Sequence, residues 1–285
     1  MSPHNLEKGL YLVSTPVGNM RDITLRALDV LSSAHSILCE DKRVTGKLLH
    51  HYGIKKPLLK YNDHSDQKDR DKIIQGIREG HSYALVSDAG TPLISDPGFK
   101  LVRACFENGL KVIPVPGANA VLPSLQLSGF ATDSFTFLGF LPRKCGEREK
   151  ILTEFTNNPC PLVIYESARR LSGTLTEASA TLGNRDAVII REITKLYEER
   201  ISGLLHDLAE LFSSQAVKGE IVIVIAPQKK EAWTETTVKA ALASALESGL
   251  SGKDAARDLA KQSGWPKTKV YNLALSLKDE RTDKL

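Results

Sequence analysis

Short β-rich apolar runs alternate with stretches of helical apolar spacing in the first part of the chain. The pattern predicts strands at residues 10–15, 36–40, 58–61, 82–87 and 111–115. Between these strands, residues 24–33, 43–52, 67–79 and 99–108 carry apolar residues at helical intervals. This alternation is typical of βαβ units, so residues 1–116 are predicted to form an N-terminal α/β domain around a mainly parallel sheet.

A second series of strands follows a junction rich in proline and glycine, PVPGANA at residues 114–120. The strands of this series are predicted at residues 135–139, 161–165, 187–191, 198–202 and 220–226. Helical stretches after Gly146 and Ala168 and at residues 204–212 separate them. We therefore expect a second α/β domain with a mixed sheet at residues 117–227.

The composition changes to alanine-rich helix after a polar linker at residues 227–231. Ser251 and Asp254 have the spacing of a capping box, and Gly264 with Pro266 is suited to end one helix and start the next. Residues 232–285 are therefore predicted to form a small helical module of the helix-turn-helix kind.

Composition narrows the class of protein without identifying its partner. The 285 residues are 41% hydrophobic, and the formal charge of +4 is compatible with RNA binding but does not require it. The four cysteines form no CxxC pair, which favours reduced thiols and a cytoplasmic protein. No run approaches the roughly 18 apolar residues of a membrane span, and the histidines have no metal-ligand spacing, so neither a membrane nor a metal is expected.

Two loops after predicted strands carry the pattern of a ligand site. One is STPVGN at residues 14–19, and the other is SDAGTPLISDPG at residues 87–98. Open α/β sheets bind ligands at the carboxyl ends of their strands, and the second loop is much longer than a simple connection needs. Since no GxGxxG follows the first strand, we expect the longer loop to hold the ligand.

These loops resemble those of the tetrapyrrole methylases, which use S-adenosylmethionine (SAM). Residues 89–92, AGTP, stand where that family has GGDP, so Thr91 replaces the usual acidic residue. Within the family, the chain resembles the branch of bacterial ribosomal RNA small subunit methyltransferases I. Six ordered motifs carry this likeness: LYLVSTPVGNMRDITLRAL, SDAGTPLISDPG, PVPGANA, FLGFLPRK, YESARRL and REITKLYEE.

The resemblance implies methylation of the 2'-hydroxyl of a cytidine in the decoding region of 16S rRNA, on the small ribosomal subunit. It also implies a homodimer, and a SAM site in a cleft that the second domain closes. The cofactor-binding positions implied are Pro16, Asp88, Ala89, Gly90, Thr91, Pro92, Ile94, Ala118, Asn119, Leu141, Tyr165 and Ile221.

A ribose hydroxyl is a weak nucleophile, so a base or a nearby cation should assist methyl transfer. The candidate catalytic residues are Lys195 with Glu192, followed by Asp41 after the second strand. An ion-pair network is the alternative interpretation of the first two. Cations in loops or after strands are the candidate RNA contacts: Arg21, Arg43, Arg143, Lys144, Arg169, Arg170 and Arg191.

Two other functions remain open at this point. A tetrapyrrole (corrin or porphyrin precursor) C-methyltransferase would share the fold and the cofactor. A nucleic-acid-binding protein without catalysis would use the helical module, whose own lysines and arginines are compatible with either RNA contact or simple packing.

Overall fold

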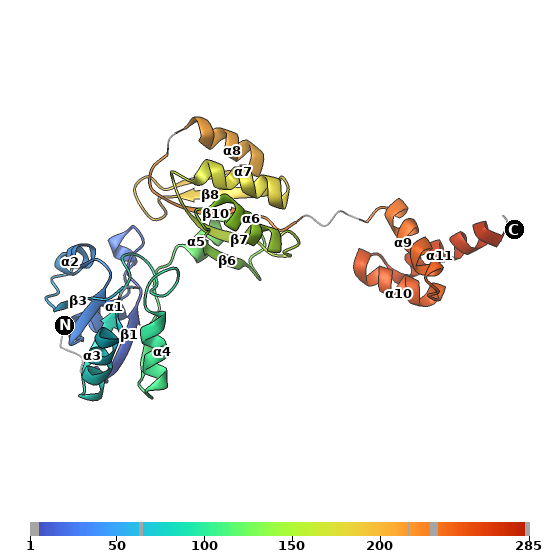
Figure 1. Ribbon diagram of the computed structural model, residues 1–285. Coiled ribbons are helices and arrows are strands. Elements are labelled where there is room, and N and C mark those ends of the chain that lie inside the picture. The colour runs from blue at the N-terminus through green and yellow to red at the C-terminus, as the bar shows by residue number, and fades with distance from the viewer. Residues whose placement is uncertain (1–5, 63–64, 216, 229–232, 283–285) are drawn as a thin grey trace. The chain divides into compact units, whose positions relative to one another are not determined.

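The computed structural model describes residues 6–62, 65–215, 217–228 and 233–282. The chain divides into two compact units, Met1–Gln228 and Lys229–Leu285 (Figure 1). The first unit contains two five-stranded sheets and the second contains helices. The predicted α/β fold with a parallel sheet, a mixed sheet and a helical module is confirmed.

The first sheet is parallel, with the strand order β3-β2-β4-β1-β5. Its strands are β1 (Gly9–Val13), β2 (Ser36–Cys39), β3 (Leu58–Lys60), β4 (Ser82–Leu85) and β5 (Val112–Val115). Residues of α1 (Leu25–Ser33) and α2 (Lys42–His51) pack in the core on one face. Those of α3 (Gln67–Arg78) and α4 (Phe99–Glu107) pack in the core on the other. A short 3-10 helix, η1 (Met20–Asp22), precedes α1.

This strand order creates a crevice between β1 and β4. The chain leaves β1 toward β2 on one side and leaves β4 toward β5 on the other. Such a switch in direction opens the carboxyl edge of a parallel sheet to a ligand. The two loops singled out in the sequence, residues 14–19 and 87–98, follow these two strands.

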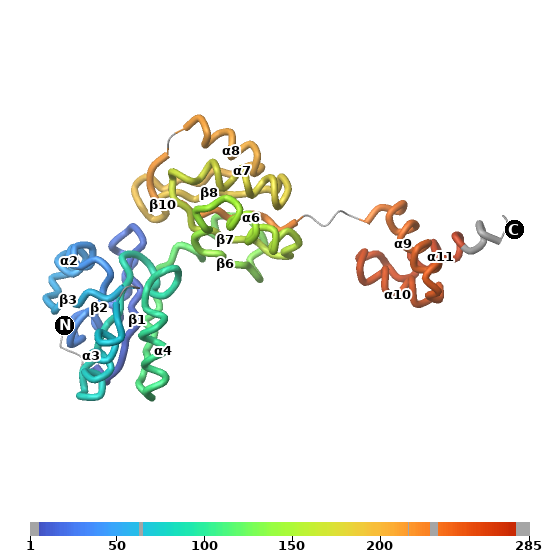
Figure 2. Tube along the Cα trace, in the orientation of Figure 1, coloured from blue at the N-terminus to red at the C-terminus, as the bar shows by residue number. Residues whose placement is uncertain are grey.

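The chain passes from the first sheet to the second through the junction between β5 and α5 (Val121–Ser128) (Figure 2). The second sheet has the order β6-β7-β10-β8-β9 and is antiparallel except for the β6–β7 pair. Its strands are β6 (Thr136–Phe140), β7 (Leu162–Ser167), β8 (Asp186–Arg191), β9 (Glu199–Leu204) and β10 (Glu220–Ile225).

Both faces of the second sheet are apolar, and helices cover both of them. One core includes leucines of α6 (Cys145–Glu154), α7 (Leu171–Leu182) and α8 (Leu205–Ser214). The opposite core includes Val121 and Leu125 of α5. Since both sheets belong to one compact unit, the domain boundary expected after residue 116 stays a prediction.

The second unit contains α9 (Glu235–Glu247), α10 (Gly252–Ser263) and α11 (Lys267–Thr282). The Ser251 hydroxyl accepts the Asp254 amide at 3.1 Å, so the predicted N-cap of α10 is confirmed. Gly264 ends the helix in the left-handed conformation, with φ 70°. Val238, Leu242 and Ala256 are fully buried in the core of this unit. Residues 229–232, which include most of the expected linker and the first residue of the expected module, lie outside the described residues.

In the described ranges no helix is both long enough and apolar enough to cross a membrane.

Candidate cofactor and active site

The two loops at the β1–β4 crevice are joined by backbone hydrogen bonds. Thr15 N donates to Gly90 O at 2.8 Å, and Gly90 N donates to Thr15 O at 3.0 Å. Gly90 adopts φ 77°, which a residue with a side chain rarely does. The glycine therefore lets the long loop lie against the first turn.

Thr91 ties these loops to the junction after β5. Its hydroxyl donates to Ala118 O at 3.0 Å and shares a second hydrogen bond of 3.0 Å with the Ser14 hydroxyl. An ionised carboxylate at this position has no proton to donate to a carbonyl. Thr91, which stands where the resemblance implies an acidic residue, thus supplies a structural link between three segments.

The long loop contains backbone strain. Leu93 and Ser95 adopt φ 72° and φ 65°, conformations that cost non-glycine residues free energy. Such strain persists where surrounding contacts impose it, and it concentrates at ligand sites.

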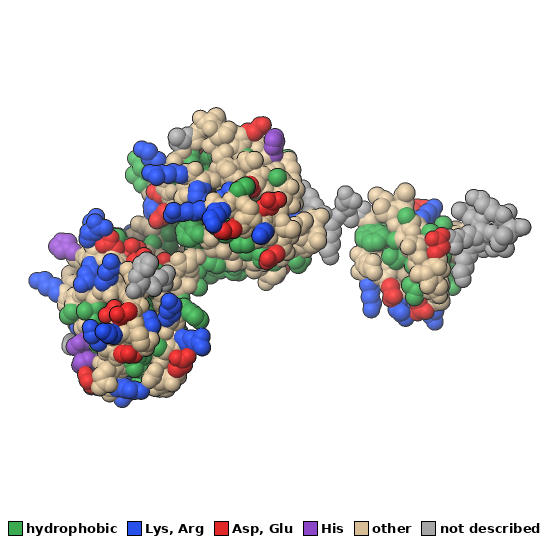
Figure 3. Space-filling view, viewed as in Figure 1, with side chains coloured by type: hydrophobic (Ala, Val, Ile, Leu, Met, Phe, Trp, Pro, Cys, Tyr) green, Lys and Arg blue, Asp and Glu red, His purple; other side chains and the backbone are tan. Residues whose placement is uncertain are grey.

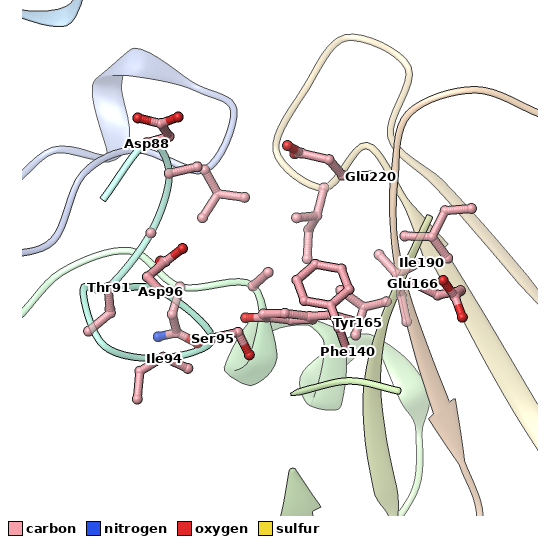
Figure 4. A pocket seen from close by; sticks show the side chains of 18 of the residues that line it. Asp88, Thr91, Ile94, Ser95, Asp96, Phe140, Tyr165, Glu166, Ile190 and Glu220 are labelled. Carbon is pink, nitrogen blue, oxygen red and sulfur yellow. The ribbon is translucent and has the colours of Figure 1, made fainter. Parts of the chain in front are cut away.

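A pocket of about 400 Å³ opens beside this loop and continues to the second sheet (Figure 4). This volume lies within the usual range of small-molecule sites. Eight of the sequence-predicted cofactor positions line it: Asp88, Ala89, Gly90, Thr91, Ile94, Asn119, Tyr165 and Ile221. Sequence reasoning missed other lining residues, which include Val17, Ser95, Asp96, Phe140, Glu166, Ile193 and Glu220.

Four predicted positions are not part of this lining: Pro16, Pro92, Ala118 and Leu141. Leu141 belongs to the core that α6, α7 and α8 cover and is 2% exposed, whereas its neighbour Phe140 lines the pocket. The reason is a register shift between Phe137 and Gly139, which leaves Phe140 opposite Tyr165 on β7. A bulge adds one residue and thereby exchanges the faces of the residues that follow.

The pocket lining is acidic. It contains Asp88, Asp96, Glu166 and Glu220, and among the described lining residues there is no lysine or arginine. In Figure 4, Asp88 and Asp96 lie on one side of the pocket, and Glu220 and Tyr165 lie on the other. Glu166 is balanced by Arg170, whose Nε lies 3.1 Å from Glu166 Oε1. Glu220 binds the ammonium group of Lys195, which lies outside the lining, at 2.9 Å. The acidic lining itself favours a ligand with positive charge.

Burial and neighbouring charge shift two titratable groups of the lining. Burial, with a smaller contribution from Asp96, raises the pKa of Tyr165 to about 12, so its hydroxyl stays protonated. Burial also raises the pKa of Asp88, and the nearby charge of Asp41 adds to the effect. Asp88 therefore accepts a proton more readily than an ordinary aspartate.

Lys195 and Glu192, the first catalytic candidates, lie beside the pocket and outside its lining. Lys195 Nζ donates to Glu192 Oε1 at 3.0 Å and to Glu220 Oε2 at 2.9 Å. Burial lowers the pKa of Lys195, but its bonds to Glu220 and Glu192 outweigh that effect, and the net shift is upward. Lys195 is therefore a fixed ammonium group that reaches the pocket wall through Glu220.

Asp41 caps the N-terminus of α2 and forms a two-oxygen pair with Arg43, in which Arg43 Nη2 lies 2.7 Å from Asp41 Oδ2. The Arg43 hydrogen bonds lower the pKa of Asp41 to about 2. The Asp41 amide donates to Asp88 Oδ1 at 3.2 Å, so Asp41 lies one hydrogen bond behind the lining. Its low pKa makes it a weak base.

In the described part of the chain, no three histidine, cysteine, aspartate or glutamate side chains converge on a point that could hold a metal. His64 lies outside the described residues.

Comparison with known proteins places the chain in a family. The model of "Tetrapyrrole (Corrin/Porphyrin) Methylases" matches residues 9–209. Ribosomal RNA small subunit methyltransferase I of Mesorhizobium japonicum is 42% identical over 276 residues, covering 96% of this chain and 94% of the relative. The protein of the same name from Rickettsia prowazekii is 46% identical over 220 residues, covering 77% and 79%. The chain is a tetrapyrrole methylase of the ribosomal RNA small subunit methyltransferase I branch.

The remaining comparisons concern the two compact units of this family member. The model "RsmI C-terminal HTH domain" matches residues 231–278, which contain α9, α10 and most of α11. Uroporphyrin-III C-methyltransferase from Thermus thermophilus, solved with S-adenosyl homocysteine, has a TM-score of 0.56 at 21% identity. The alignment covers 76% of this chain and 96% of the methyltransferase chain. At 21% identity the likeness concerns the fold alone.

The predicted RNA contacts of this methylase divide into two groups. Within the described residues, Arg21, Arg143 and Arg169 are exposed and make no ion pair. The other four are paired with carboxylates: Arg43 with Asp41, Lys144 with Glu147, Arg170 with Glu166 and Arg191 with Glu199. Acidic and basic side chains are interspersed on the visible face (Figure 3). Whether a cation is paired with a carboxylate therefore distinguishes these candidate RNA contacts better than where the cation lies on the surface.

Arg170 has a structural role that the sequence did not indicate. Its Nη2 donates to Leu141 O at 2.7 Å and to Pro142 O at 3.3 Å. Arg148 also donates to Pro142 O, at 3.5 Å, and pairs with Glu177. These buried contacts hold the segment that presents Arg143 to solvent.

Proposed function

We propose that this protein transfers a methyl group from SAM to the 2'-hydroxyl of a cytidine in the decoding region of 16S rRNA. The substrate class is supported by the names of its relatives at about 40% identity over nearly the whole chain. The choice of the 2'-hydroxyl and of a cytidine follows the resemblance of six ordered motifs. The reaction would take place in the cytoplasm, on the small ribosomal subunit.

The single observation that carries the cofactor assignment is the acidic pocket at the β1–β4 crevice. SAM has a sulfonium and an ammonium group, and the acidic lining, which includes Asp88, Asp96 and Glu220 and has no lysine or arginine among its described residues, complements these charges. Apolar side chains in the same wall, such as Ile94, Phe140 and Ile221, suit its adenosine part. When bound, SAM supplies an electrophilic methyl group.

Several of the chain's own groups would hold the cofactor. The backbone of residues 88–91 and Asn119 lie on the side of the first sheet, and Tyr165 and Ile221 lie on the side of the second. We place Phe140 at this wall instead of Leu141, since Phe140 lines the pocket. Pro16, Pro92 and Ala118 would act by shaping the loops behind the lining.

The attacking hydroxyl must lose a proton as its bond to the methyl group forms. We assign Lys195 the electrostatic role: its ammonium would stabilise negative charge on the ribose oxygen, while Glu192 and Glu220 hold its position. Asp88 is better suited than Asp41 to accept the proton, because the pKa of Asp88 is raised and that of Asp41 is about 2.

RNA phosphates would contact the unpaired cations Arg21, Arg143 and Arg169. Each phosphate contact releases counterions, so affinity should fall steeply with salt. Of the remaining candidates, Arg43 and Lys144 are exposed and could exchange a carboxylate partner for a phosphate. We place Arg170 and Arg191 behind this surface, because both are mostly enclosed and bind backbone carbonyls.

We also propose that the protein is a homodimer. Phe99 and Phe106 of α4 are 67% and 64% exposed and lie seven residues apart, on one side of the helix. A second copy would bury such side chains. Light scattering at working concentration should give twice the mass of the chain; the mass of a monomer would rule the dimer out.

The proposed reaction can be tested with labelled SAM. Transfer of label would be measured to small ribosomal subunits, to naked rRNA and to a uroporphyrinogen-type macrocycle, followed by mass spectrometry of the nucleosides. We expect 2'-O-methylcytidine from ribosomal RNA. Label on the macrocycle alone would assign the chain to tetrapyrrole biosynthesis, and no transfer with intact SAM binding would contradict both enzymatic assignments.

A further inference from the structure

The loop between β8 and β9, residues 192–198, is held rigidly by its own contacts. Glu192 Oε1 accepts the Glu220 amide at 2.9 Å, and Thr194 N donates to Glu198 Oε2 at 2.6 Å. Glu192 and Thr194 adopt φ 50° and φ 62°, which these hydrogen bonds impose at a cost in free energy. The loop therefore has one defined shape.

This rigid loop exposes two large side chains at its tip. Leu196 is 88% exposed, more than any other large hydrophobic side chain in the described residues, and Tyr197 is 71% exposed. Ile193, in contrast, is 6% exposed and lines the pocket. The loop is thus anchored by an apolar residue at the pocket and presents two more to solvent.

The tip is connected directly to the pocket rim. Leu196 follows Lys195, whose ammonium binds Glu220 of the pocket wall at 2.9 Å. On the other side, Asn19 N donates to Thr194 Oγ1 at 3.0 Å. This bond fixes the loop against the turn that carries Val17, another lining residue. Leu196 and Tyr197 are therefore carried by a loop that is bonded to two segments of the pocket wall.

The tip is flanked in sequence by Lys195 on one side and by Glu198 and Glu199 on the other, and both glutamates are already engaged, with Thr194 N and with Arg191. Two exposed cations also belong to segments that contact this loop. Arg21, exposed and without an ion pair to the described residues, lies two positions from Asn19. Lys218 is exposed, and its carbonyl accepts Arg191 Nη1 at the base of the hairpin. Unstacked RNA bases bind apolar and aromatic side chains that have cations nearby, because each base offers a flat apolar face beside a charged backbone.

We propose that Leu196 and Tyr197 form a stacking wedge for RNA. Tyr197 would stack on a base next to the target nucleotide, and Leu196 would fill the space that the target leaves when it turns into the pocket. An enzyme that modifies a nucleotide must first remove it from its stack, and apolar wedges are a common device for this. The inference rests on the proposed function, since it concerns how the same site receives RNA.

The test compares Tyr197→Ala and Leu196→Ala with Tyr197→Phe, which keeps the ring, and with Leu59→Ala. Leu59 is a 41% exposed leucine on β3, an edge strand of the first sheet. Methyl transfer to small-subunit rRNA and SAM affinity would be measured for each. We expect KM for RNA to rise about 5- to 150-fold in Tyr197→Ala, which corresponds to ~1–3 kcal/mol, with SAM affinity unchanged. Tyr197→Phe and Leu59→Ala should behave as the unmodified protein.

A fluorescence measurement tests the wedge separately. An RNA fragment with 2-aminopurine next to the methylated cytidine should brighten on binding the unmodified protein, and Leu196→Ala should reduce this change. If the unmodified protein methylates rRNA while both alanine variants keep its KM and its fluorescence change, the wedge is wrong and the proposed function stands. A halved mass of either variant in light scattering would assign the tip to an interface between copies and also overturn the inference. No methylation of rRNA by the unmodified protein would instead contradict the proposed function.

Discussion

At Gly18 the structure predicts that the addition of one atom, a Cβ, lowers stability and activity. A Cβ added there would collide with Lys195 Cγ and would lie 2.8 Å from both Ile193 O and Thr194 Oγ1. The lysine stem can move, but the Ile193 carbonyl belongs to the rigid loop of residues 192–198. Gly18→Ala must therefore push the first turn away from that loop. Overpacking of this kind costs about 1–3 kcal/mol.

Differential scanning calorimetry of the full chain measures this cost. For a unit of this size, a loss of 1 kcal/mol lowers Tm by roughly 2–4 °C, so we expect Gly18→Ala to lower the Tm of the first unit by roughly 2–12 °C. Methyl transfer should fall as well, because a displacement near 1 Å in an active site can reduce turnover by about two orders of magnitude.

Gly46 offers the matched control. It lies inside α2, and a Cβ there would meet only Leu58 Cδ1, at an ordinary 3.9 Å. Gly46→Ala should therefore raise stability by about 0.5–1 kcal/mol, because alanine loses less conformational entropy in a helix. If Gly18→Ala retains the Tm and turnover of the unmodified protein, the close contact between the first turn and the 192–198 loop does not exist in solution.

Three further predictions concern other contacts of the first unit. Lys195→Met should lower kcat about 100- to 1000-fold, as loss of an oxyanion-type donor does, with SAM affinity unchanged by calorimetry; undiminished turnover would remove Lys195 from the catalytic groups. Thr91→Val, which loses hydrogen bonds to Ser14 and Ala118, should weaken SAM binding about 5- to 10-fold, or ~1–1.4 kcal/mol, whereas Thr91→Ser should retain it. The rings of His35 and His81 are stacked with their centroids 3.8 Å apart, and they should make stability depend on pH. Burial and the charge of His81 lower the folded-state pKa of His35. The stability that neutral His35 contributes is therefore complete above about pH 6.5 and is lost as the pH falls below that value. The Tm measured between pH 7.5 and 5.5 should therefore fall less in His81→Gln than in the unmodified protein, and equal slopes would contradict this.

The sequence predicted the strands and helices well because their signals are local. β-branched runs marked strands such as β10, and apolar residues at helical spacing marked the helices. The position of the long loop at a ligand site also followed, since parallel strands place their carboxyl ends at one edge. The sequence did not predict the hydrogen bond between Thr91 and Ser14 of the first turn, because it joins residues far apart in the chain.

The part of the pocket formed by the second sheet could not be predicted in the same way. Glu220 reaches the pocket because β10 pairs antiparallel with β7 and β8, a relation between residues far apart in sequence. Phe140 was missed because the bulge in β6 leaves no clear sequence signal. The sequence alone also does not reveal that Glu166 and two carbonyls surround the guanidinium of Arg170.

The bulge in β6 also bears on how this wall of the pocket can change during evolution. Between Leu138 and Leu141 the order of inward and outward side chains depends on one additional residue, with Gly139 at φ 64°. A deletion at the bulge would restore regular pairing and keep Phe140 opposite Tyr165. Loss of the bulge without a deletion would instead move Phe140 opposite Glu166, on the other face of the sheet, and Leu141 would then face the pocket, with no substitution at either position. Gain or loss of this bulge, more than a point mutation at either position, is therefore expected to separate relatives that bind different ligands at this wall.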